Sequence, residues 1–178
     1  LGFHDFAGSC AIHMVGGISA LIGAKILGPR IGKFDTDKNG KVVKVNAIPG
    51  HNITAGALGV FILWLGWYGF NAGSALAANG LAAHAFMTTS VSAAAGLVSW
   101  MLIEVFSEGK TTLVGTSTGL VIGLVAITPG AGFVPMWAAV ICGLLVSPIC
   151  YFGVKLIKGK LKIDDALDAF GCHGIGGI

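Results

Sequence analysis

The chain has 178 residues, of which 54% are hydrophobic and only 11% are charged, and its mean hydropathy is +0.85. A soluble domain carries about 25% charged residues, so this composition excludes an ordinary water-soluble protein and indicates a chain that faces lipid. The net charge of +3 is small and offers no case for a nucleic-acid partner. The four cysteines lie in apolar stretches without paired spacing, which predicts buried thiols and neither a disulfide framework nor a metal cluster.

Five apolar segments qualify as membrane spans, and a sixth begins before the chain stops. A hydrocarbon core of about 30 Å needs roughly 20 helical residues. The chain starts without an initiator Met or a signal peptide and stops within a helix-like pattern, so we interpret it as an internal fragment of a longer protein. We therefore predict an all-α, polytopic helical membrane protein whose single transmembrane domain, residues 1–178, is truncated at both ends. The predicted spans are at about 6–26, 53–74, 81–103, 113–127, 133–154 and, as a partial span, 165–178.

The basic residues give the orientation of these spans. All 11 Lys and Arg residues lie in or beside the connections after the first, third and fifth spans, and the other two connections carry no charge. By the positive-inside rule the three basic connections are cytoplasmic, so the first span runs inward and the sixth runs outward. Within the first basic connection, Asp35 to Gly40 opens like a calcium loop. The twelfth position is Asn46 instead of a bidentate Glu, so we predict a hydrophilic turn.

Two histidines lie inside predicted spans, and each follows an acid by eight residues. Asp5 precedes His13 in the first span, and Asp165 precedes His173 in the sixth. Eight helical residues rise about 12 Å, which places each imidazole near the middle of a core about 30 Å thick. Because the two units enter from opposite faces with equal spacing, they are typical of an inverted repeat that would bring the rings together. Two structural interpretations stay open: histidines as ordinary hydrogen-bonding groups between helices, and acids as helix caps.

Several motifs around these residues resemble signatures of the ammonium transporter family. They are Asp5-Phe6-Ala7-Gly8 with His13, Gly66 to Ser74, and Asp164 through Gly174, together with Gly50-His51-Asn52 and Ile127-Thr128-Pro129. The resemblance is colinear and covers the whole chain. It implies an ammonium-transporter-like fold with a partial inverted repeat, in which this chain corresponds to the fifth through the early tenth of eleven helices.

The resemblance also implies roles for individual residues. It matches His13 and His173 to the twin histidines of the substrate pore, and Asp5 to the acid near the outer recruitment site. The remaining matches are to the recruitment site and its gate (Ser74, Phe70), to further pore-side positions (Trp67, Thr118) and to supporting acids (Asp165, Asp168). Neutral imidazoles offer a donor and an acceptor in line, so a proton and a neutral amine can cross an apolar tube separately.

By resemblance, the expected function is transmembrane transport of ammonium or ammonia, with methylammonium as an analogue. The expected protein is a multi-pass protein of the cell membrane, is not an enzyme, and needs no cofactor or metal. Its expected partners are the lipid bilayer, further copies in a homotrimer and a PII-type regulatory protein at the cytoplasmic face, with no nucleic acid. Three alternatives remain. One is an ammonium sensor with the same core, and another is a haem protein with its ligands at His13 and His173. The third is an intramembrane hydrolase or metalloenzyme, for which neither a His-Glu-x-x-His nor a Gly-x-Ser-x-Gly motif is present.

Overall fold

Each segment with the composition of a membrane span contains a helix in the computed structural model, which describes residues 2–178. Four helical stretches are long and apolar enough to cross a membrane, and a fifth apolar helix, Leu113–Ile127, is shorter. The prediction of a polytopic helical membrane protein is therefore confirmed. In chain order the elements are η1 (Ser9–Met14), α1 (Val15–Leu27), β1 (Phe34–Thr36), β2 (Val42–Val45), α2 (Ile53–Asn71), η2 (Ala72–Ala75), α3 (Gly80–Glu108), α4 (Leu113–Ile127), α5 (Met136–Lys155), η3 (Leu156–Lys160) and η4 (Phe170–Ile175).

Two helices differ in their bounds from the segments read in the sequence. α3 continues to Glu108, past the charge at Glu104, because Glu104 is buried and hydrogen-bonded; the helix ends where Gly109 takes a left-handed conformation with φ of 78°. Such a glycine is a common helix C-cap. The last helix begins at Phe170 and not at 165, since the residues before it lie in an irregular segment.

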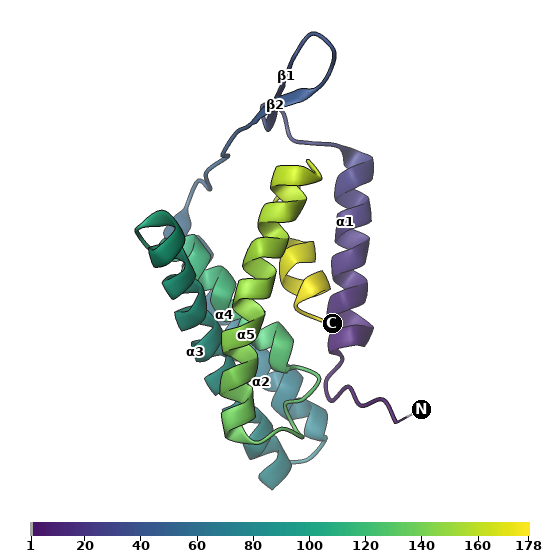
Figure 1. The fold of residues 1–178 in the computed structure, drawn as a ribbon. Helices are drawn as coiled ribbons and strands as arrows, with labels where there is room; N and C mark the ends of the chain where they lie inside the picture. The colour runs from purple at the N-terminus through teal and green to yellow at the C-terminus, as the bar shows by residue number, and fades with distance from the viewer. Residues whose placement is uncertain (1) are drawn as a thin grey trace.

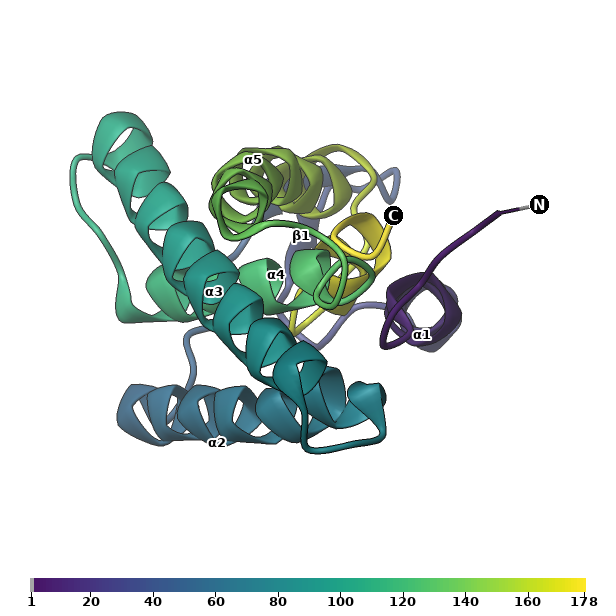
Figure 2. The ribbon, with the colours of Figure 1, turned by 90° about the horizontal axis from the view of Figure 1, so that it is seen from below.

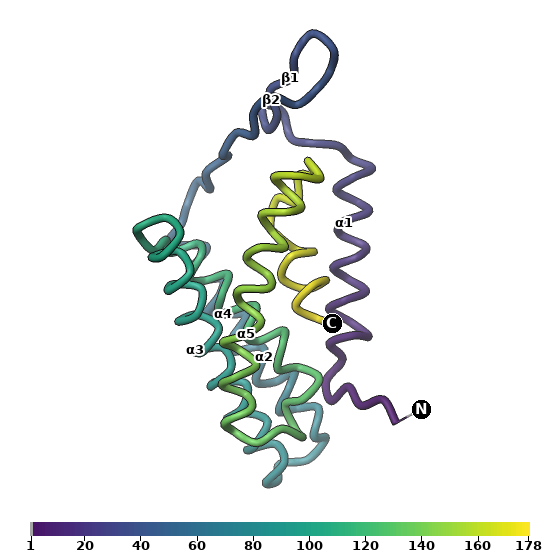
Figure 3. The backbone as a smooth tube through the Cα atoms, in the orientation of Figure 1, coloured from purple at the N-terminus to yellow at the C-terminus, as the bar shows by residue number. Residues whose placement is uncertain are grey.

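The connection after α1 contains the β-strands of the fold, which form a two-stranded antiparallel hairpin in place of a simple hydrophilic turn. The carboxylate of Asp37 accepts hydrogen bonds from the backbone amides of Asn39 and Lys41, both at 2.9 Å, and so closes the turn. Figure 3 shows that the chain leaves α1, passes through the hairpin and returns to α2 on the other side of the molecule. The strands are too short for their alternation to be recognised among so many polar residues.

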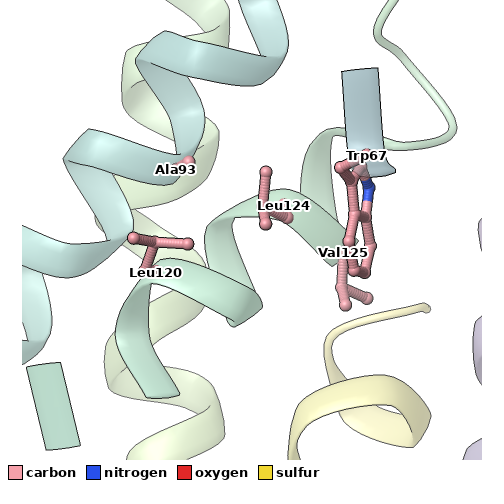
Figure 4. Close-up of a cluster of buried hydrophobic side chains, with 5 residues drawn as sticks. All are labelled: Trp67, Ala93, Leu120, Leu124 and Val125. Atoms are coloured by element: carbon pink, nitrogen blue, oxygen red, sulfur yellow. The ribbon is translucent and has the colours of Figure 1, made fainter. Parts of the chain in front are cut away.

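The core is organised around α4. Seen from below, α4 lies among α2, α3, α5 and the C-terminal segment (Figure 2). Most of its residues from Gly119 to Ile127 are buried, in keeping with a segment enclosed by other helices, whereas Leu113 and Val114 at its start are exposed. Figure 4 shows one part of this core, in which side chains of α4 lie beside residues of α2 and α3: Trp67, Ala93, Leu120, Leu124 and Val125.

Small residues let these helices approach closely. A Cβ at Gly119 would meet the side chain of Trp100 and the carbonyl of Gly96, and a Cβ at Gly123 would meet the carbonyl of Ser92. The glycines spaced by four in α4 therefore form a helix-packing stripe.

The C-terminal η4 lies against α1 and runs in the opposite direction (Figure 1). The two backbones meet at Gly17 and Gly174, where a Cβ on Gly17 would overlap the backbone of Gly174. This contact brings together the two elements that carry His13 and His173.

Candidate functional site

The rings of His13 and His173 are in direct contact. Their Nδ1 atoms lie 3.2 Å apart, and the ring centroids are separated by 5.1 Å. One neutral imidazole can donate a hydrogen bond here while the other accepts it. The prediction that the two rings lie within hydrogen-bonding reach is confirmed, although the chain places them 160 residues apart.

His13 is held by the way its helix starts. Gly8 takes a φ of 105°, and the chain then enters the π-helix η1. The carboxylate of Asp5 accepts hydrogen bonds from the amides of Gly8, Ser9 and Ala11 at 3.2, 2.7 and 3.2 Å. These amides have no partner inside the helix, so Asp5 satisfies donors that the helix start leaves free. Asp5 is therefore a cap, and its half-buried position leaves part of the carboxylate accessible.

Asp165 does the same for the second histidine. Its carboxylate accepts hydrogen bonds from the amides of Ala169 and Phe170 at 3.0 and 2.8 Å, at the start of the π-helix η4. Unlike Asp5, Asp165 is buried. The two acids thus have one structural task, repeated at the beginning of each histidine-bearing helix.

Two aromatic side chains of α2 line one side of the histidine pair. The indole of Trp67 is nearly parallel to the ring of His13, with centroids 5.0 Å apart, and lies 6.5 Å from that of His173. Phe70 meets His13 edge-on at 5.6 Å. The indole nitrogen of Trp67 donates a 3.0 Å hydrogen bond to the hydroxyl of Thr128, which fixes the plane of the ring.

A cavity of about 200 Å³ opens beside the imidazoles. Its walls are mostly apolar or glycine backbone, and within residues 2–178 the buried Nε2 of His13 has no hydrogen-bond partner. A buried polar atom without a partner is costly, so this nitrogen is suited to a polar guest. The cavity is lined by Ile12, His13, Gly16, Gly17, Ala169 and His173.

Three other expected site residues form hydrogen bonds or ion pairs with groups other than the histidines. Within residues 2–178, the hydroxyl of Ser74 donates to the carbonyl of Phe70 at 2.7 Å, and that of Thr118 donates to the carbonyl of Val114 at 2.9 Å. Asp168 forms an ion pair of 2.6 Å with Lys158. None of the three therefore forms a hydrogen bond with the histidine pair in the part of the chain that the structure describes.

Sequence reasoning missed an ion pair at the other end of the same two elements. Arg30, just after α1, directs its Nε and Nη2 atoms at the two oxygens of Asp164, both at 2.7 Å. The hydrogen bonds from Arg30, and its charge, lower the pKa of Asp164 to about 2. A signal for the pair was present, because Arg30 is the single arginine among 11 basic residues, and arginine is the side chain that binds a carboxylate in a two-pronged manner.

Two short helices of opposite direction, which meet through their histidines among long apolar helices, define a polytopic membrane protein with an inverted repeat about a polar midpoint. The sequence profile described as the Ammonium Transporter Family matches residues 1–178, and the chain belongs to this family. This makes it a multi-pass protein of the cell membrane.

Curated relatives agree over nearly all of the chain. It is similar to the ammonium transporter of Bacillus subtilis, with 44% identity over 99% of this chain and 41% of the relative. It is also similar to the ammonium transporter of Aquifex aeolicus, with 46% identity over 99% of this chain and 39% of the relative. The chain thus spans about two fifths of the length of these relatives.

Solved structures share the arrangement of the helices. A sensor Amt protein superposes with a TM-score of 0.92 at 36% identity, covering 99% of this chain and 42% of the other. Mep2 of Candida albicans superposes with a TM-score of 0.84 at 39% identity, covering 99% of this chain and 37% of the other. The ammonium-transporter-like fold is therefore shown for the residues that the structure describes.

Proposed function

We propose that the protein moves ammonium or ammonia across the membrane through a narrow apolar path whose midpoint is the pair His13 and His173. The observation that carries the proposal is the 3.2 Å contact between the two Nδ1 atoms, made by helices that enter from opposite ends. Ionisable side chains inside membrane helices usually mark a pathway. The names of the relatives, which are ammonium transporters, support the same substrate.

The chemistry follows from the cost of moving charge through hydrocarbon. Two imidazoles in contact cannot both be charged without strong repulsion and loss of hydration. A neutral pair sharing one hydrogen bond can instead accept a proton at one end and release it at the other, while the neutral amine passes separately. Potassium has no proton to release and gains nothing from this relay.

The outer part of the path has features that suit a cation. Asp5 is half-buried at the start of the helix that carries His13, and the aromatic rings of Trp67 and Phe70 lie against His13. Aromatic faces and a hydroxyl such as that of Ser74 can replace part of the hydration of ammonium. We propose that ammonium is recruited and deprotonated at this end, with Thr118 and the acids Asp165 and Asp168 supporting the inner part of the path.

Currents of the full-length protein in a planar bilayer test this function. Wild type should carry current in ammonium and not in potassium. Changing either histidine to Asp removes the relay and supplies a fixed negative charge, so the variant should pass potassium as well as ammonium. His13→Ala and His173→Ala should lower the ammonium current by at least about a hundredfold, the low end of the contribution that a positioned proton-transfer group makes.

Unchanged current and ion preference in all four variants would make the histidines structural groups and overturn the proposal. A protein that binds ammonium but carries no flux would instead be a sensor, since a sensor Amt protein shares this core. The direct ring contact favours a relay over the haem alternative, because two axial histidines would lie on opposite faces of the haem, and rings whose nitrogens are 3.2 Å apart leave no room for the macrocycle between them.

The expected partners are proposals of the same kind. Large apolar side chains are exposed on α1 and α2, which suits contact with lipid and with further helices of a homotrimer. The hairpin and the lysines after α5 lie at the predicted cytoplasmic end and offer a surface for a PII-type regulatory protein. Native mass spectrometry of the full-length protein, alone and with such a regulator, would show both assemblies.

A further inference from the structure

The ion pair between Arg30 and Asp164 joins the two elements that carry the histidines. Arg30 donates three hydrogen bonds to one carboxylate: its backbone amide at 3.0 Å, and Nε and Nη2 at 2.7 Å each. The side chain of Asp164 is 1% exposed, whereas that of Arg30 is 41% exposed. The carboxylate is thus fully enclosed and depends on Arg30 for its neutralisation.

Asp164 lies directly before the residue that caps η4, so its contact with Arg30 can influence where η4 begins. The next residue, Asp165, caps η4 through the amides of Ala169 and Phe170, and His173 lies on η4. Arg30 follows α1, which continues directly from the π-helix that carries His13. The pair therefore links the origin of one histidine-bearing segment to the far end of the other.

The ion pair adds a directional contact to η4. The other face of η4 packs through apolar side chains, since Cys172 lies in a buried cluster with Cys150 and Tyr151 of α5. The contacts of η4 with η1 and α1 include the histidine rings and the backbone approach of Gly17 to Gly174. Just beyond η4, the thiol of Cys10 donates a 3.4 Å hydrogen bond to the carbonyl of Gly177. Glycine against glycine lets the helices come close but offers no side chain that fixes sliding or rotation. A two-pronged ion pair does fix both, because its two hydrogen bonds define a plane and a direction.

We propose that Arg30 and Asp164 form a positioning pair that sets the register of η4 against α1 and thereby holds the Nδ1 atoms of His13 and His173 in contact. The inference rests on the proposed function, in that the histidine contact is taken to serve transport. It assigns a role in the path to two residues that lie outside it, one of which is the single arginine of the chain.

The test uses the full-length protein with the substitution Arg30→Gln. Two readouts are taken: ammonium current per folded molecule, and the ¹⁵N NMR signals of the two imidazoles, which report the hydrogen bond between the rings. We expect Arg30→Gln to weaken or abolish that hydrogen bond and to lower the current by about tenfold or more, since it leaves a buried carboxylate unpaired. Arg30→Lys keeps the charge but not the two-pronged geometry and should lie between Arg30→Gln and wild type.

Two combined variants separate positioning from general stability. In Arg30→Gln/Asp164→Asn the unpaired charge is gone, so folding should recover relative to Arg30→Gln while the ring contact stays weak. In Arg30→Gln/His173→Ala the current should be no lower than in His173→Ala alone, because both changes act on the same contact. The matched control is Lys155→Gln, which breaks the 3.2 Å ion pair with Glu108 between α5 and α3 and should leave both readouts unchanged.

The outcomes for this pair and for the proposed function can be told apart. If Arg30→Gln changes only the yield of folded protein, with wild-type current per molecule and wild-type imidazole signals, the positioning role is wrong. If the histidine signals shift as expected but His13→Ala and His173→Ala carry wild-type current, the positioning role stands and the relay is wrong.

Discussion

The two histidine-bearing units, residues 5–13 and 165–173, have the same plan but different electrostatics. In both, a carboxylate caps a π-helix and a histidine follows eight residues later. Asp5 is half-buried and forms no ion pair within residues 2–178, whereas Asp165 is buried and has the ion pairs of Asp164 with Arg30 and of Asp168 with Lys158 on either side of it in the chain. The capping carboxylate of the first unit thus lies in a half-exposed residue, whereas that of the second is enclosed and has ion pairs on neighbouring residues. The two units share a geometry but differ in the exposure of their acids.

The largest effects are expected when each of the two capping acids is removed in turn. Asp5→Ala should abolish uptake of labelled methylammonium into vesicles while the full-length protein still folds, and Asp5→Glu should leave little uptake because its longer side chain cannot reach all three amides. Asp165→Ala should act mainly on the yield of folded protein, since it uncovers buried donors. Asp35→Ala on the exposed hairpin serves as the control. Normal uptake by folded Asp5→Ala protein would reduce Asp5 to a cap.

A second substitution tests the contact between the units. Gly17→Ala places a methyl group on the backbone of Gly174, and we expect it to destabilise the protein by about 1–3 kcal/mol, the usual cost of overpacking. Gly16→Ala is the neighbouring control, because nothing lies within 4 Å of a Cβ at that position. Thermal unfolding in detergent measures the difference. Equal melting temperatures for the two variants would mean that η4 does not pack against α1 as described.

A substitution of Ser74 tests whether the outer end of the path binds a cation. Its hydroxyl donates to the carbonyl of Phe70, so its oxygen remains free to accept a hydrogen bond from a cation. Ser74→Ala should raise the apparent KM for methylammonium about fivefold, equivalent to about 1 kcal/mol for one hydrogen bond, and leave the maximal rate unchanged. Ser90→Ala, whose hydroxyl bonds within α3 and to Tyr68, is a suitable control. A fall in maximal rate with constant KM would assign Ser74 to a later step.

The smallest effect concerns pH at the inner end. The pKa of Asp164 is lowered from an ordinary 3.8 to about 2, so its pair with Arg30 contributes stability above pH 4 that is lost as the pH falls toward 2. Between pH 5 and 8, the difference in melting temperature between wild type and Arg30→Gln/Asp164→Asn should therefore stay constant. It should shrink below pH 4. A difference that varies across pH 5 to 8 would point to another titrating group.

The sequence could predict the histidine contact but not the π-helical winding or the ion pair that accompany it. Equal spacing from an acid, opposite polarity and hydrophobic surroundings were enough to bring His13 and His173 together. The π-helical winding was not readable, because it depends on which amide bonds which carbonyl and leaves no mark in composition. The partnership of Arg30 with Asp164 was missed because 134 residues separate them, and the hairpin because its strands are only 3 and 4 residues long.

The π-helical winding of η1 and η4 has a consequence for how related chains should be aligned. In a π-helix each amide bonds the carbonyl five residues back, so the turn holds one residue more than an α-helical turn. Losing one residue while the winding stays the same would turn everything beyond it by about 100°. A one-residue gap between Asp5 and His13, or between Asp165 and His173, would therefore aim the imidazole at a different neighbour unless the π-turn rewound as an α-turn. Loops elsewhere in the chain can vary in length, but the number of residues in these two intervals fixes the direction in which each imidazole points.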